Sequence, residues 1–217
     1  MANFLPQNAP RELDLNTFKA KLDGYGSVAK GCRFAVRILP AGTGNLLSSL
    51  GYNSFMQDLT FVCESADFPG RGFDVTESRY YGAPFLLPRN TKYEAANLAF
   101  ICRTDSMERQ LFDDWLELIN PTNIWDFNYA KQYYCKIEIF QFAEFGEPGR
   151  AQNGAGIPKP VYQWNLWQAW PMLVAPQQVT WAETDILRLS VTFAYRYWSR
   201  PGRDADPTGG EITLTPQ

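Results

Sequence analysis

The most informative absence in this sequence of 217 residues is histidine, which does not occur at all. Histidine is the commonest metal ligand in proteins and the commonest general base in enzymes. Without it no Ser-His or Cys-His catalytic arrangement can form, although chemistry based on carboxylates alone stays open. We therefore predict a protein that is not an enzyme and that holds no metal or cofactor.

An excess of basic residues is also missing. The chain has 20 lysines and arginines against 23 aspartates and glutamates, which gives a net charge of −3. Because lysine and arginine drive binding to nucleic-acid phosphates, this balance argues against an ordinary nucleic-acid-binding protein. It leaves room for a local basic patch.

Cysteine is scarce, and no two cysteines form a Cys-x-x-Cys pair. Cys32, Cys63, Cys102 and Cys135 each lie in an apolar stretch with the composition of a strand. This placement favours buried free thiols in a reducing compartment. Two disulfides or a metal site are the alternatives.

Long apolar runs are absent as well. Residues 38–57 are rich in glycine and serine, and residues 160–182 contain three prolines and several amide side chains. Neither window offers the roughly 20 predominantly apolar residues of a membrane-spanning helix. The first residues lack the basic and apolar regions of a signal peptide. We expect a soluble protein.

What the sequence does contain is alternation of apolar and polar residues, which predicts seven or eight strands. The candidate strands are residues 32–39, 57–68, 73–81, 93–103, 124–130, 133–142, 161–174 and 185–198. A short helix is expected at 13–26, and a glycine- and serine-rich loop at 40–56.

One substantial helix is expected at residues 105–119. Asp105 is the predicted N-cap, and Glu108 three positions later completes a capping-box pattern. Asp113 and Asp114 lie on the face opposite the apolar one, so they suit a polar face rather than catalysis. The predicted apolar face consists of Met107, Leu111, Trp115, Leu118 and Ile119.

These elements predict a mainly β protein of the α+β class, an antiparallel β-sandwich or barrel with one flanking helix at about 105–119 and an extended hairpin arm. A chain of 217 residues that is 45% hydrophobic suits one sizeable core. We expect a single domain, 1–217, with its core at about 13–198. Loop insertions at 40–56 and 144–160 and a flexible C-terminal tail at 199–217 complete it.

Three tryptophans, Trp164, Trp167 and Trp170, raise the question of a platform for stacking sugars or bases. Their spacing of three does not place all of them on one face of a strand. Packing in the core and at interfaces is therefore the simpler explanation, and an aromatic-rich β-sandwich binding module stays as an alternative.

A set of short motifs points to a known family. They are Pro-Gly-Arg at 69–71, Tyr-Tyr-Gly-x-Pro-Phe at 80–85, Phe-Asp-Asp-Trp followed by Ile-Asn-Pro at 112–121, Trp-Pro at 170–171, and Phe-Ala-Tyr-Arg-Tyr-Trp at 193–198. As a set, they resemble the tail tube proteins of contractile-tailed bacteriophages. The resemblance covers roughly residues 13–143 and 162–198.

The resemblance implies a structural virion protein without chemistry. Its hexameric rings would stack into a hollow tube inside the contractile sheath and conduct DNA from the capsid to the host. The implied partners are further copies of the chain, the tail sheath protein, baseplate and tail-terminator proteins, and the tape-measure protein and DNA in the lumen. The implied location is the phage tail, after assembly in the host cytoplasm. A baseplate tube initiator or a tube terminator is the nearest alternative.

The stretch Arg-Tyr-Tyr-Gly-Ala-Pro-Phe-Leu-Leu-Pro-Arg-Asn at 79–90 fits this function. It is too apolar and too irregular to belong to one protomer's own core, and Gly82 would let a hairpin arm bend away from its sheet. We predict that the arm packs on a neighbouring subunit. The predicted interface residues are Tyr80, Tyr81, Pro84, Phe85, Leu86 and Leu87.

Four strand residues suggest a second kind of site, the wall of the lumen. Glu64, Glu77, Glu94 and Glu138 would make that wall acidic if their strands faced it together. An acidic wall repels DNA phosphates and would let DNA slide. The simpler explanation for each of them is a solvent-facing position on an alternating strand.

Overall fold

The alternating segments form an antiparallel β structure in the computed structural model, which describes residues 19, 29–40, 45–79, 81–142, 160–182 and 185–201. The strands are β1 Phe34–Pro40, β2 Cys63–Ala66, β3 Arg71–Ser78, β4 Phe85–Tyr93, β5 Ala96–Ile101, β6 Cys135–Phe142, β7 Pro160–Val174, β8 Arg188–Ala194 and β9 Tyr197–Ser199. The helical segments are η1 Leu46–Leu50, α2 Asn53–Val62, α3 Met107–Ile119 and α4 Ala130–Tyr133.

These elements belong almost entirely to the larger of two units, which comprises Phe34–Gln141 and Val161–Gln217. Three predictions lie outside the described residues almost entirely: the helix at 13–26, the loop at 144–160 and the C-terminal tail at 199–217. They stay predictions.

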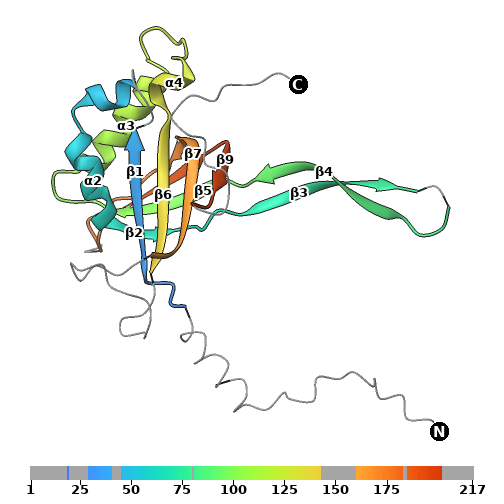
Figure 1. The fold of residues 1–217 in the computed structure, drawn as a ribbon. Helices are drawn as coiled ribbons and strands as arrows, with labels where there is room; N and C mark the ends of the chain where they lie inside the picture. Colours follow the sequence, from blue (N-terminus) through green and yellow to red (C-terminus); the bar gives the residue numbers. More distant parts are fainter. Residues whose placement is uncertain are drawn as a thin grey trace. The chain divides into compact units, whose positions relative to one another are not determined.

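Seven of the strands form one sheet in the order β1-β6-β7-β8-β5-β2, with β9 beside β7 (Figure 1). The strand pairs for which a register is defined are antiparallel. The edge strands β1 and β2 are not paired with each other in the described residues, so the barrel is open. The predicted mainly β, antiparallel fold is confirmed.

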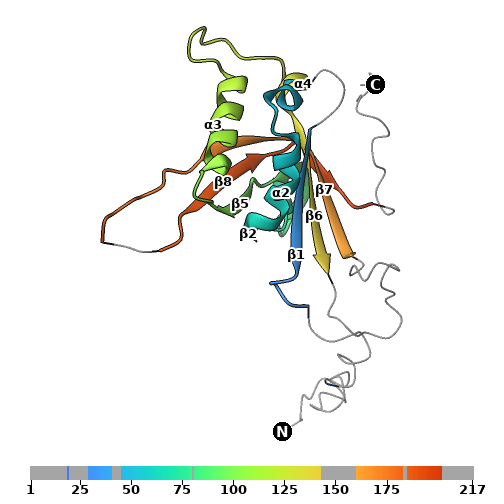
Figure 2. The ribbon, with the colours of Figure 1, turned by 90° about the vertical axis from the view of Figure 1, so that its left-hand side faces the viewer.

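Strand β7 serves both parts of the sheet because it bends. Asn165–Trp167 pair with β9, whereas Trp170–Val174 pair with β8. Between these halves, Gln168 has a φ of 54°, an uncommon left-handed conformation for a residue other than glycine. The bend lets one strand cross from the part that contains β1 and β6 to the part that contains β5 and β8 (Figure 2).

The centre of the core is aromatic. Phe112 and Trp115 of α3 pack against Phe100 of β5 and Phe193 of β8, with ring centroids 5.4–6.1 Å apart. All four side chains are fully buried. Trp115 Nε1 donates a hydrogen bond to the Tyr133 carbonyl oxygen at 3.0 Å, so its polar atom is satisfied. Helix α3 is thereby fixed on the sheet, as predicted for the flanking helix.

The predictions for residues 40–68 were wrong over most of their length. The stretch expected as a loop contains η1 and the first turn of α2, and the strand expected at 57–68 begins only at Cys63. Phe55, Met56 and Leu59 are buried at the spacing of a helix, and α2 packs on β1. The β-favouring run Thr60-Phe61-Val62 gave a strand signal that this packing overrides.

The capping box predicted for α3 is also absent. Helix α3 begins at Met107 after Ser106, whose φ is 51° and whose side chain makes no capping bond. The Glu108 carboxylate is fully buried and accepts instead from Arg103, from its backbone nitrogen at 3.1 Å and from Nε at 2.7 Å.

No helix in the described part of the chain is both long and apolar enough to cross a membrane.

The strand predicted at 124–130 was wrong as well. These residues form a turn and an irregular segment, and α4 then begins at Ala130. Trp125 has a φ of 58°, and Asn128 Nδ2 donates to the Leu118 carbonyl oxygen at 2.7 Å. The segment therefore caps the C-terminal end of α3, and Ile124, Trp125 and Phe127 stay exposed.

Candidate assembly surface

The hairpin of β3 and β4, called the arm below, separates from the rest of the sheet. In the described residues its strands pair only with each other, and in Figure 1 it extends away from the other strands. Each residue of both strands is exposed except Tyr93, which is half-buried. The predicted hairpin arm is therefore confirmed as a structural element.

A β-bulge explains why residues 79–90 fail to alternate. Asp74 is opposite Asn90 and Val75 is opposite Pro88, so Arg89 is an extra residue with no partner position. The bulge shifts the alternation by one residue. It also interrupts the ladder of hydrogen bonds next to Pro88, which has no N–H to donate to that ladder.

The register places apolar side chains on both faces of the arm. One face, called face A, carries Phe73, Val75, Leu86 and Pro88, and the other, face B, carries Phe85 and Leu87. The exposed fractions of the five large side chains run from 45% for Leu87 to 67% for Phe85. A partner that covers only one face would leave large apolar side chains in water on the other.

The root of the arm is anchored by aromatic contacts. The Arg71 guanidinium lies over the Tyr93 ring at 5.9 Å, and the Tyr93 ring meets that of Tyr195 edge-on at 6.1 Å. Trp198 Nε1 donates to the Gly70 carbonyl oxygen at 3.3 Å. Burial first, and then the nearby Tyr93 and Glu94, raise the pKa of Tyr195 to about 12.

The tip of the arm carries the other predicted interface residues. The Tyr81 side chain is 89% exposed, and Gly82 has a φ of 86°, a conformation that a side chain would strain. Pro84 is exposed beside them. Tyr80 lies outside the described residues.

The structure does not gather the four glutamates predicted to line a lumen. Glu77 lies on face A of the arm, and Glu94 lies between β4 and β5. Glu64 Oε2 accepts from Arg188 Nε at 2.6 Å, so its charge is paired.

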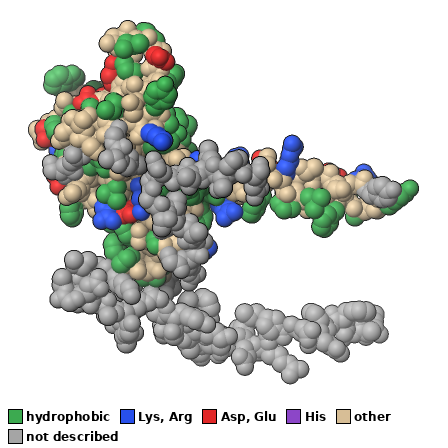
Figure 3. All heavy atoms as spheres, turned by 45° about the horizontal axis from the view of Figure 1, so that its top comes forward, with side chains coloured by type: hydrophobic (Ala, Val, Ile, Leu, Met, Phe, Trp, Pro, Cys, Tyr) green, Lys and Arg blue, Asp and Glu red, His purple; other side chains and the backbone are tan. Residues whose placement is uncertain are grey.

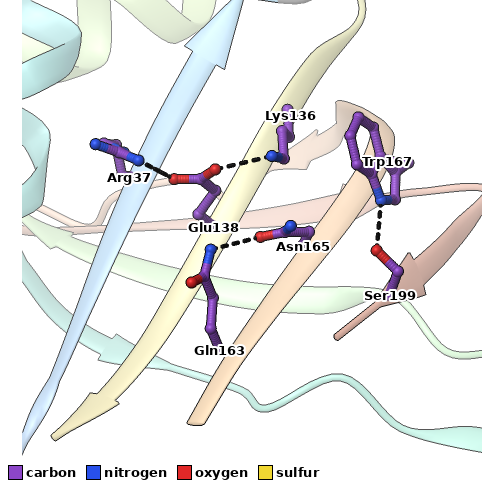
Figure 4. Close-up of polar contacts among 7 residues, drawn as sticks. All are labelled: Arg37, Lys136, Glu138, Gln163, Asn165, Trp167 and Ser199. Atoms are coloured by element: carbon purple, nitrogen blue, oxygen red, sulfur yellow. Dashed lines mark hydrogen bonds and ion pairs between the residues drawn. The ribbon is translucent and has the colours of Figure 1, made fainter. Parts of the chain in front are cut away.

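Glu138, the fourth of these glutamates, is buried in a polar cluster that Figure 4 shows. Arg37 of β1 forms an ion pair with its carboxylate, and Lys136 Nζ lies 2.9 Å from Oε1. Burial alone would raise the pKa of Glu138, but hydrogen bonds from Lys136 and Arg37 outweigh it and hold the pKa below its usual value. This carboxylate is neutralised within the protomer.

The three tryptophans of β7 do not form one platform. Trp164 stacks on Phe68 at 4.5 Å, and Trp167 Nε1 donates to Ser199 Oγ at 2.9 Å in the cluster of Figure 4. Trp170 meets Tyr133 edge-on at 6.4 Å. Because each ring has different neighbours, the arrangement favours packing over a stacking site.

The four cysteines are free thiols, as predicted, but their burial varies. Cys135 is buried, Cys63 and Cys102 are half-buried, and Cys32 is exposed, which corrects the prediction for that residue. Burial raises the pKa of Cys63 to about 12, so this thiol is unreactive at neutral pH. In the described residues, no cluster of three or more Cys, Asp or Glu side chains could hold a metal ion.

A second apolar surface lies beside α3 and was not predicted. A hollow of about 390 Å³, called the α3 groove below, is formed by α3, the segment after it and the second half of β7. Its apolar lining consists of Leu116, Ile119, Phe127, Trp170, Pro171 and Met172. Two exposed carboxylates, Asp113 and Glu117, also line it and are called its rim below. Phe127 belongs to the segment that was predicted as a strand, so the α3 groove could not be predicted from the sequence.

Comparison with known proteins identifies relatives with the same fold. The family model described as phage tail tube protein matches residues 29–201. No curated protein sequence matches the chain. At 16% identity and a TM-score of 0.55, the chain is similar to a protein in the extended PVC sheath–tube complex of an extracellular contractile injection system, over 83% of this chain and 95% of that one.

Two structures of the anti-feeding prophage are similar too. A protein of its six-fold symmetrised baseplate matches with a TM-score of 0.52 and 13% identity, over 80% of this chain and 95% of that one. A protein of its tube-terminating cap matches with a TM-score of 0.50 and 17% identity, over 80% and 90%. These likenesses show a shared fold.

Proposed function

The chain belongs to the phage tail tube protein family, and from that premise we propose that it is the major tail tube protein of a contractile tail. Its six-fold rings stack into a hollow tube within the sheath, and DNA passes through the lumen to the host. The chain acts in this tube as one domain. The family is structural rather than enzymatic.

The arm is the observation that supports this proposal most directly. A two-stranded hairpin is marginally stable alone in water, and this one has large apolar side chains on both faces. A sheet edge or apolar face of this kind is covered in stable proteins. Neighbouring copies in a ring or in the next ring can cover both faces at once.

The energy that the arm can supply favours assembly through many contacts. Fully burying a Val, Leu or Phe side chain contributes about 1.5–3 kcal/mol. Scaled by the exposed fractions of Phe73, Val75, Phe85, Leu86 and Leu87, the arm supplies roughly 4–9 kcal/mol. Association costs an estimated 4–15 kcal/mol. One arm alone therefore gives a weak dimer, whereas a closed ring, in which each copy gives and receives an arm, is stable.

The same proposal implies a lumen wall that is acidic, but with fewer glutamates than the four predicted from the sequence. Glu64 and Glu138 have basic partners, so the acidic contribution to the wall rests on Glu77 and Glu94. The sheath, the baseplate, the terminator and the tape-measure protein are the other partners, and the assembled tail is the place of action. Assembly takes place in the host cytoplasm.

A terminal role is the second candidate, because the fold is shared with a tube-terminating cap at a TM-score of 0.50. The two roles differ in whether assembly propagates. A tube protein adds ring upon ring, whereas a cap stops at one ring.

Light scattering coupled to size exclusion tests the proposal and separates the two roles. For a tube protein, the mass of the purified full chain of 24.7 kDa rises with concentration beyond a hexamer. A mass that stops at one ring supports the cap, and a monomer at all concentrations contradicts both. Glycan binding that is lost in Trp167→Ala would instead support a binding module.

A further inference from the structure

The α3 groove has the size and lining of a binding site for apolar side chains. Its volume of about 390 Å³ lies in the range of about 300–1,000 Å³ that is typical of ligand pockets. Two of its lining side chains are well exposed, Phe127 at 69% and Met172 at 50%. A segment that entered the groove would cover these apolar surfaces.

The rim of the groove is acidic. Asp113 forms an ion pair with Arg109, four residues earlier on the same helix, with 2.8 Å between Asp113 Oδ2 and Arg109 Nε. Glu117 Oε1 accepts from the backbone nitrogen and the hydroxyl of Thr122, at 2.8 and 2.9 Å. In the described part of the chain no lysine or arginine pairs with Glu117. The rim therefore offers an uncompensated carboxylate to a basic partner.

The arm has the opposite charge. Residues 71–93 contain four basic and two acidic residues, a net charge of +2, which leaves sixteen basic and twenty-one acidic residues, a net −5, in the rest of the chain. Arg79, Arg89 and Lys92 form no ion pair with another described residue, and Figure 3 shows basic and hydrophobic side chains together along the arm. Complementary charge of this kind guides two surfaces together and fixes their register.

The arm and the groove cannot meet within one protomer. In Figure 1 the arm extends from one side of the sheet, and α3 lies at the other. At about 3.3 Å per residue, β3 is roughly 26 Å long and β4 roughly 30 Å, so the arm extends well beyond the rest of its own protomer. A contact between these two surfaces joins two copies.

We infer that the α3 groove of one copy receives the arm of a second copy. Leu86, on face A of the arm, enters the apolar hollow, and the bulge residue Arg89 lies near Glu117. The contact is head to tail, because a different surface of each copy takes part, and such contacts close into rings or continue as filaments. The inference rests on the proposed function and adds the place on the neighbour where the arm binds.

Disulfide trapping between two variants of the full chain tests this contact. Both variants carry Cys32→Ser, because Cys32 is the exposed native thiol. One also carries Leu86→Cys and the other Met172→Cys. Mixed and gently oxidised, they are expected to form a disulfide-linked dimer of one copy of each. Gln57→Cys, at an exposed position on α2, replaces Met172→Cys in the matched control and is expected to give no such dimer.

Charge exchange gives a second readout that does not depend on thiols. Arg89→Glu is expected to weaken assembly by about tenfold, and Glu117→Arg in the same chain is expected to restore it. A rescue of this kind cannot come from a general loss of folding.

The outcomes separate the inference from the proposed function. If the unmodified chain forms tubes but Leu86→Cys links equally to the control position, the arm binds elsewhere and only the inference is overturned. If the Met172→Cys thiol is protected by a segment of its own chain, the groove has a different occupant and the inference is again overturned. If the unmodified chain stays a monomer, the proposed function fails as well.

Discussion

Replacing two apolar residues of the arm should weaken assembly strongly and leave the protomer folded. The change is Phe85→Ser with Leu87→Ser, both on face B, which are 67% and 45% exposed. Because neither side chain is buried in the protomer, its thermal midpoint and circular dichroism should match those of the unmodified chain.

The size of the effect follows from those exposed fractions. Burying the exposed parts of the two side chains against a neighbour contributes about 2–3 kcal/mol, at about 1.5–3 kcal/mol for a whole side chain. Each 1.4 kcal/mol changes an equilibrium constant about tenfold, so the critical concentration for polymerisation should rise roughly 30- to 150-fold.

Sedimentation of assembled protein over a range of total concentrations measures that critical concentration. Thr91→Ser, a polar position on face A of the arm, is the matched control and should leave it unchanged. Tubes that form at the normal concentration from the double variant would refute the reasoning, because the arm would then contribute no contact. A loss of the circular dichroism signal of the folded protomer would also refute it, because both residues would then be needed for the protomer's own core.

Three further predictions concern the core, the polar cluster and the lumen. Trp115→Ala should lower the free energy of unfolding by about 3–5 kcal/mol in chemical denaturation, because it empties the centre of the aromatic core; a loss below about 1 kcal/mol would contradict that packing. The pKa of Glu138 is lowered in the folded state, so its contribution to stability is complete above the unfolded value of about 4.3 and is lost as the pH falls through the lower folded value. The free energy of unfolding should therefore fall less between pH 7 and pH 3 in Glu138→Gln than in the unmodified chain. An equal fall in both proteins would argue against the lowered pKa. Glu77→Gln with Glu94→Gln should slow genome release from assembled particles and leave tube formation intact, as measured by DNA release and microscopy, whereas failed assembly would place these residues in interfaces.

Most of the sheet could be predicted from the sequence, because alternation records which face of a strand is buried. Val36 and Ile38 alternate with Arg37 in β1, and Leu189, Val191 and Phe193 alternate with polar residues in β8. Both strands pack one face on the core and expose the other. The flanking helix was predicted for the same reason, since Leu111 and Trp115 recur at helical spacing.

The errors occur where tertiary contacts override local preference. Thr60, Phe61 and Val62 favour a strand, but the burial of Met56 and Leu59 against β1 holds α2 as a helix. In the same way, Glu108 has the position of a capping residue, yet Arg103 takes its carboxylate. Neither contact leaves a trace in the local sequence.

Of the two candidate surfaces, one could be predicted from the sequence and the other could not. The arm could be predicted because its apolar residues had no place in a protomer core, although its bulge at Arg89 and its two apolar faces needed the register of β3 and β4. The α3 groove could not be predicted, because it brings Phe127 together with Met172, 45 residues further along the chain. For the lumen glutamates, alternation was misleading. Glu138 occupies a position that alternation predicts to be exposed, but its side chain is buried between Arg37 and Lys136.

Electron microscopy of the purified full-length chain, without any other tail component, tests the central claim most directly. If the chain is a tail tube protein whose arm joins neighbouring copies, the images should show hollow tubes of stacked six-fold rings with a central channel. Isolated monomers at high protein concentration would contradict the account.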